Sequence, residues 1–105
     1  MKFDIDEVIN RATKTALELI AKTDLTSLKE LEESNASVPV GDDWHIFMDF
    51  GYRPDLTKIW LWFSLEDNTQ DGWQNSLDEQ DTTDLSEDSI RLNLRYLLKD
   101  WQFEE

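Results

Sequence analysis

The chain has 105 residues, of which 39% are apolar and 11% aromatic, and its formal net charge is −14. This length fits one compact domain over residues 1–105, and five tryptophans provide enough aromatic bulk for a core, which argues against wholesale disorder. The negative charge opposes binding to nucleic acid and to anionic membranes and favours a cationic partner.

The first predicted element is an amphipathic helix over residues 4–22. Asp4 and Glu7 form a helix-start signal, and Phe3 is placed to pack on Val8. A second short helix is predicted to end near Ser34, with one bent helix over residues 4–33 as the alternative. The apolar positions of both helices recur at helical spacing: Ile5, Val8, Ile9, Ala12, Ala16 and Ile20, then Leu25, Leu28 and Leu31.

Residues 35–43 are predicted to be irregular because they contain Pro39 and Gly41. Two strands over residues 44–65 are then predicted to form an antiparallel hairpin around the loop 51–55. One face of this hairpin is apolar and can seat the helices: Trp44, Ile46, Met48, Phe50, Ile59, Leu61, Phe63 and Leu65.

The opposite face of the hairpin carries His45, Phe47, Trp60 and Trp62. Two interpretations of this face stay open. In the first it is a second core layer that the last helix covers. In the second it is an exposed aromatic patch that anchors a partner, because tryptophan is enriched at the energetic centres of interfaces.

Residues 66–89 contain nine acidic residues and no basic residue, so this segment holds −9 of the net charge of −14. A weaker strand or loop is expected around residues 73–77. Placing like charges this close opposes folding, and selection for solubility alone would intersperse them. We therefore interpret the segment as a surface that attracts a cationic partner.

The last predicted element is a helix over residues 85–101, introduced by Asp84 and Glu87. Its apolar positions form a narrow face: Ile90, Leu94, Leu97, Leu98 and Trp101. The order of elements predicts an α+β fold, in which two N-terminal helices and one C-terminal helix pack on a small antiparallel sheet, with a possible third strand beside the hairpin.

The sequence offers little catalytic chemistry. It has no cysteine, a single histidine, His45, and no glycine-rich phosphate loop, so no catalytic residue, cofactor or metal ligand is assigned and no enzyme is expected. Residues 67–78 resemble an EF-hand calcium loop in spacing, but Thr69 and Asp78 depart from the pattern and a strand precedes it. A turn at Asp71-Gly72 is the simpler interpretation.

Two absences bear on location. No apolar run approaches the ~20 residues of a membrane span, and the N-terminal segment lacks the apolar stretch of a secretory signal. We therefore expect a cytoplasmic protein that binds a basic protein and neither nucleic acid nor a membrane. The predicted partner-binding residues are the acids and tryptophans of the acidic segment and hairpin: Asp71, Trp73, Asp78, Glu79, Asp81, Asp84, Trp60 and Trp62.

In size, charge and lack of catalytic motifs, the chain resembles the small acidic bacterial immunity proteins that neutralise nuclease toxins. The resemblance includes the acid-rich stretch 78–84 with Trp73 upstream. It implies inhibition by occupying the toxin's nucleic-acid-binding surface. Nucleic-acid-mimic inhibitors of DNA-binding defence proteins, of the anti-restriction or anti-CRISPR type, are similar for the same physical reason and are the alternative.

Overall fold

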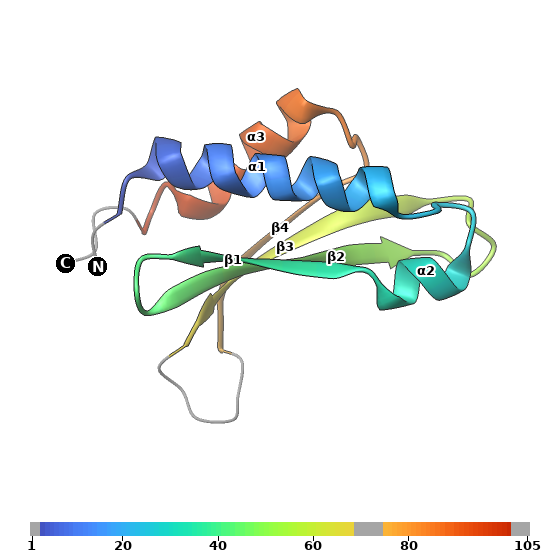
Figure 1. Ribbon diagram of the computed structural model, residues 1–105, viewed down its shortest axis with the longest axis horizontal. Coiled ribbons are helices and arrows are strands. Elements are labelled where there is room, and N and C mark those ends of the chain that lie inside the picture. Colours follow the sequence, from blue (N-terminus) through green and yellow to red (C-terminus); the bar gives the residue numbers. More distant parts are fainter. Residues whose placement is uncertain (1–2, 69–74, 102–105) are drawn as a thin grey trace.

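The computed structural model describes residues 3–68 and 75–101. Its elements follow in the order α1 (Ile5–Lys22), α2 (Leu28–Glu33), β1 (Asn35–Val40), β2 (Trp44–Tyr52), β3 (Ile59–Asp67), β4 (Asn75–Thr82) and α3 (Glu87–Leu98) (Figure 1). Neighbouring strands are antiparallel, and the sheet order β1-β2-β3-β4 matches the chain order. The α+β class is confirmed.

Side-chain caps fix where the helices begin. The Asp4 carboxylate accepts hydrogen bonds from the backbone N–H groups of Asp6 and Glu7, as the start signal predicts. Ser27 caps α2 in the same way, after the chain has left α1 at Thr23. The first two helices are therefore separate, and the alternative of one bent helix is wrong.

Helices α1 and α3 lie side by side on the same face of the sheet, as Figure 1 shows. Beneath them the predicted apolar face is buried, with Ile46, Met48, Leu61, Phe63 and Leu65 fully enclosed. The interpretation in which the last helix covers the opposite face is therefore wrong, because the apolar side of α3 joins the core that α1 covers.

Both edge strands differ from the prediction. Residues 35–40, expected to be irregular, form β1, where Pro39 is tolerated because an edge strand has one side without a partner. The Pro39 carbonyl accepts a hydrogen bond from the Arg11 guanidinium at 2.8 Å. At the other edge, the acidic segment forms β4, a full strand over Asn75–Thr82 with a register shift opposite Leu65 and Glu66.

Candidate functional site: the open face of the sheet

The candidate site is the face of the sheet turned away from α1 and α3, which we call the open face. The strand register places its side chains in rows across β2, β3 and β4. The rows are Asp49, Trp62 and Asp81; Phe47, Ser64 and Glu79; and His45, Glu66 and Ser76, with Trp60 opposite Gly51 at one end. Helices α1 and α3 both lie on the opposite side of the sheet and leave this face uncovered by either of them (Figure 1).

The charge of the molecule is divided between its two layers. The four strands contain no lysine or arginine, but they contain six acidic residues: Asp49, Glu66, Asp67, Asp78, Glu79 and Asp81. In the helical layer, by contrast, three arginines pair with acids, and the distances are 2.9 Å for Arg11–Glu7, 2.9 Å for Arg91–Glu87 and 3.2 Å for Arg95–Asp6. The negative charges of the sheet are therefore less balanced by positive charges than those of the helical layer.

Glu66 lies in the centre of one row and is only 3% exposed. Its carboxylate contacts His45 Nε2 at 2.9 Å, and His45 Nδ1 contacts the side-chain oxygen of Asn68. A buried carboxylate needs such a partner, because its isolated charge is costly away from water. His45 is thus held at both ring nitrogens, which indicates a structural role for this side chain.

Asp49 differs from Glu66 because its carboxylate has no such partner among the described residues. It is partly buried, yet it makes no hydrogen bond or ion pair with any residue that the structure describes. Burial raises the pKa of the Asp49 carboxyl, and the nearby negative charge of Glu66 raises it further. The charged form of Asp49 therefore opposes folding, and a cation brought by a partner would relieve that cost.

The aromatic side chains Phe47, Trp60 and Trp62 are partly exposed among these acids. The Trp60 indole lies against the backbone of Gly51, where a Cβ atom would come within 2.6 Å of Cζ2 and closer still to Nε1 and Cε2. The Lys58 ammonium lies 5.8 Å from the centre of the same ring, within the range of a cation–π contact. Gly51 is therefore required for the position of this indole.

A short chain of hydroxyl groups orients Glu79. Ser64 Oγ, which is fully buried, lies 3.0 Å from Ser76 Oγ, and the Ser76 hydroxyl donates to the Glu79 carboxylate at 3.1 Å. Ordered side chains lose less conformational freedom when they bind. Glu79 is exposed, so its held carboxylate faces solvent at the β4 side of the open face.

Four of the predicted partner-binding residues, Trp60, Trp62, Glu79 and Asp81, meet on the open face. Asp78 is separate, since it lies opposite Leu65 and its carboxylate accepts a hydrogen bond from Trp101 Nε1 at 3.5 Å.

Asp84 stands at the start of α3, where it accepts hydrogen bonds from the Ser86 N–H at 3.0 Å and the Ser89 hydroxyl at 2.8 Å. These bonds lower the pKa of the Asp84 carboxyl.

Asp71 and Trp73, and most of the calcium-like loop, lie outside the described residues. Sequence reasoning missed Asp49 and Glu66 as members of the site. Both lie at even spacing from its aromatic residues along β2 and β3, and this spacing places them on the same face.

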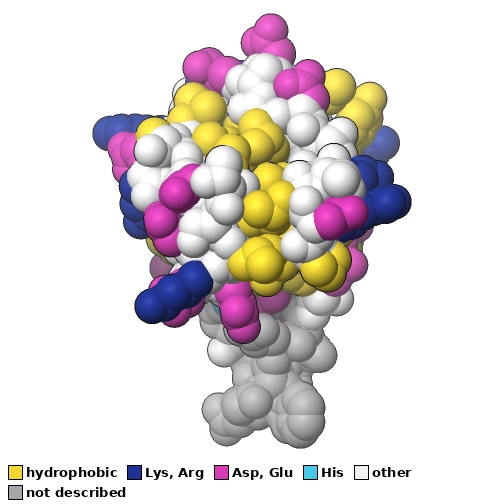
Figure 2. All heavy atoms as spheres, turned by 90° about the vertical axis from the view of Figure 1, so that its right-hand side faces the viewer, with side chains coloured by type: hydrophobic (Ala, Val, Ile, Leu, Met, Phe, Trp, Pro, Cys, Tyr) yellow, Lys and Arg dark blue, Asp and Glu magenta, His cyan; other side chains and the backbone are white. Residues whose placement is uncertain are grey.

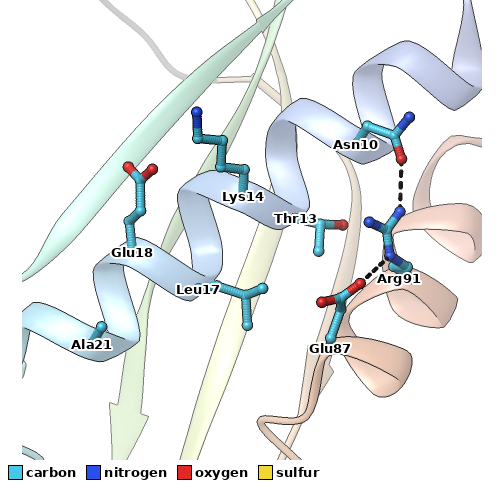
Figure 3. A pocket seen from close by; sticks show the side chains of 8 residues that line it. All are labelled: Asn10, Thr13, Lys14, Leu17, Glu18, Ala21, Glu87 and Arg91. Carbon is cyan, nitrogen blue, oxygen red and sulfur yellow. Dashed lines mark hydrogen bonds and ion pairs between the residues drawn. The ribbon is translucent and has the colours of Figure 1, made fainter.

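Two other surfaces of the molecule differ from the open face in charge. A groove of about 370 Å³ lies between α1 and α3 and is lined by Asn10, Thr13, Lys14, Leu17, Glu18, Ala21, Glu87 and Arg91 (Figure 3). Its two basic and two acidic residues balance one another, and Arg91 bridges Asn10 and Glu87. The end of the molecule near α2 shows hydrophobic side chains among charges of both signs (Figure 2). Neither surface resembles the open face, whose strands contain acidic residues and no lysine or arginine.

No protein-family model, curated protein or solved structure matches the chain. Among the residues that the structure describes, no helix is long and apolar enough to cross a membrane, and no group of three or more His, Cys, Asp or Glu residues is arranged to hold a metal ion.

Proposed function

We propose that this protein is an inhibitor that binds a basic protein partner through the open face, in the manner of an immunity protein that blocks a nuclease toxin. One observation carries the proposal: three partly exposed aromatic side chains lie among acidic ones on a sheet whose strands contain no lysine or arginine. Aromatic anchors supply most of the binding energy in such interfaces, and complementary charges supply specificity and rapid association.

The sheet face is a better docking surface than the sheet edges. Adding a strand from a partner requires free N–H and C=O groups along an edge. On β1, Pro39 has no N–H and its carbonyl is bonded to Arg11. On β4, the Glu79 N–H is bonded to the Asp78 carboxylate at 2.8 Å. Each edge therefore has a position that hinders strand addition, which favours the open face as the surface that receives the partner.

Asp49 supports the same proposal through its effect on stability. A partly buried carboxylate beside Glu66, with no partner among the described residues, opposes folding in its charged form. Residues that reduce stability persist where function needs them. Contact with a cationic surface gives Asp49 such a function.

The alternative, a nucleic-acid mimic that blocks a DNA-binding defence protein, relies on charge above all. The central position of Trp62 between two carboxylates favours an anchored protein–protein interface, because a mimic of phosphates needs no aromatic centre. In either case the partner is a basic protein. The activity that binding suppresses, cleavage by a toxin or DNA binding by a defence protein, distinguishes the two.

The test is capture of partners from the native host, followed by an assay of the purified partner with and without this protein. The open-face variant carries Asp49→Asn and Asp81→Asn. The control carries Glu18→Gln and Asp88→Asn, which remove the same charge from exposed positions of α1 and α3. We expect the wild type and the control to capture and inhibit a basic nuclease, and the open-face variant to lose most of this activity. Equal inhibition by both variants would contradict the proposal.

A further inference from the structure

We infer that the open face receives an arginine side chain of the partner, with its guanidinium stacked on the Trp62 indole between the carboxylates of Asp49 and Asp81. This inference rests on the proposed function and specifies which cation the face selects. It concerns the central row of the open face, where three strands place the three side chains next to one another.

The geometry of the row suits a planar cation. Adjacent strands are separated by about 4.8 Å, so each carboxylate lies one strand away from the indole, on opposite sides of it. A guanidinium can stack on an aromatic ring and donate from its edges to carboxylates in the same plane. A lysine ammonium is a compact charge that cannot span the two acids in this way.

The molecule already contains one contact of this type. The Lys58 ammonium lies 5.8 Å from the centre of the Trp60 ring, so this indole already has a cation of the chain over its face. Among the described residues, no lysine or arginine occupies the same position over Trp62. The open face therefore has one tryptophan supplied with a cation and one, flanked by acids, that lacks it.

The environment of Asp49 also selects arginine over lysine. Asp49 is partly buried, so a cation that approaches it must lose water. A guanidinium is more weakly hydrated than an ammonium and loses that water at a smaller cost. Phe47, which precedes Asp49 on the same face of β2, offers apolar surface for the aliphatic part of an arginine side chain.

The experiment compares two short acetylated peptides of equal length and charge, one with arginine and one with lysine, titrated into the full protein at low salt and followed by tryptophan fluorescence and calorimetry. For the wild type we expect the arginine peptide to bind about fivefold more tightly or better. Trp62→Leu should reduce this preference to nearly one while some binding by charge remains. Asp81→Asn, at an exposed position that does not threaten the fold, should also reduce the preference.

The control with Glu18→Gln and Asp88→Asn should keep the full preference for arginine. Equal affinity of the wild type for both peptides overturns the inference and leaves binding of cationic partners intact. An arginine preference that survives both Trp62→Leu and Asp81→Asn also overturns it, because the discrimination would then lie elsewhere. If neither peptide binds the wild type at low salt, the proposed function fails as well.

Discussion

Replacement of Gly51 by alanine tests how the open face is built. A Cβ atom at this position would lie 2.6 Å from Trp60 Cζ2 and closer to two other indole atoms, against a normal carbon–carbon contact of about 3.5–4.0 Å. The indole must therefore move by about 1 Å or more. Extra atoms in a packed site typically cost about 1–3 kcal/mol, whereas alanine in place of a strand glycine normally gains about 0.5–1 kcal/mol. The net expectation is a loss of about 1 kcal/mol.

A double-mutant cycle separates these two effects. In the wild-type background, Gly51→Ala should lower the free energy of unfolding and change the near-ultraviolet circular dichroism of the tryptophans. In a Trp60→Ala background the clash is absent, so the same change should be neutral or should stabilise the protein by about 0.5–1 kcal/mol. Equal effects of Gly51→Ala in the two backgrounds would refute the packing of the indole on Gly51.

Three further predictions follow from the open face and its surroundings. Asp49→Asn should raise the free energy of unfolding at neutral pH. Because folding raises the pKa of the Asp49 carboxyl, the cost of its charged form is present above the folded pKa and disappears as the pH falls below the pKa of the unfolded chain. Chemical denaturation that finds the same stabilisation at neutral and at strongly acidic pH would contradict this reasoning. The double variant Glu79→Gln with Asp81→Asn should associate more slowly with a basic partner at low salt, as measured by stopped flow. Asp84→Asn should instead weaken the start of α3, where Asp84 accepts two hydrogen bonds, and should lower the Tm in thermal unfolding. The protein should not shift DNA or RNA in a gel at micromolar concentration near physiological salt, because its net charge is −14 and its strands contain no lysine or arginine.

The sequence predicted the elements with strong periodicity. The stripe of α1, its cap at Asp4 and the inward face of β2 and β3 all agree with the structure, because burial of one face imposes a regular spacing on apolar residues. β1 was missed because Pro39 and Gly41 are usually breakers, and only the edge position of the strand makes Pro39 acceptable.

Only the structure shows which face of the sheet α3 covers and which residues form the candidate site. The apolar face of α3 could have covered either side of the sheet, and sequence periodicity does not say which. Asp49 is a single acid in an aromatic strand, and the sequence around it does not mark it as a site residue. The strand register brings Asp49 beside Trp62 and separates Asp78 and Asp84 from the open face.

The most direct test of the account follows the indole N–H signals of the tryptophans by nuclear magnetic resonance during titration with the arginine peptide. Trp60 and Trp62 lie on the open face, whereas Trp44 and Trp101 pack against each other on the helical side, with ring centres 5.5 Å apart. We expect the Trp60 and Trp62 signals to shift with the peptide while those of Trp44 and Trp101 stay in place. Shifts confined to Trp44 and Trp101 would contradict binding at the open face.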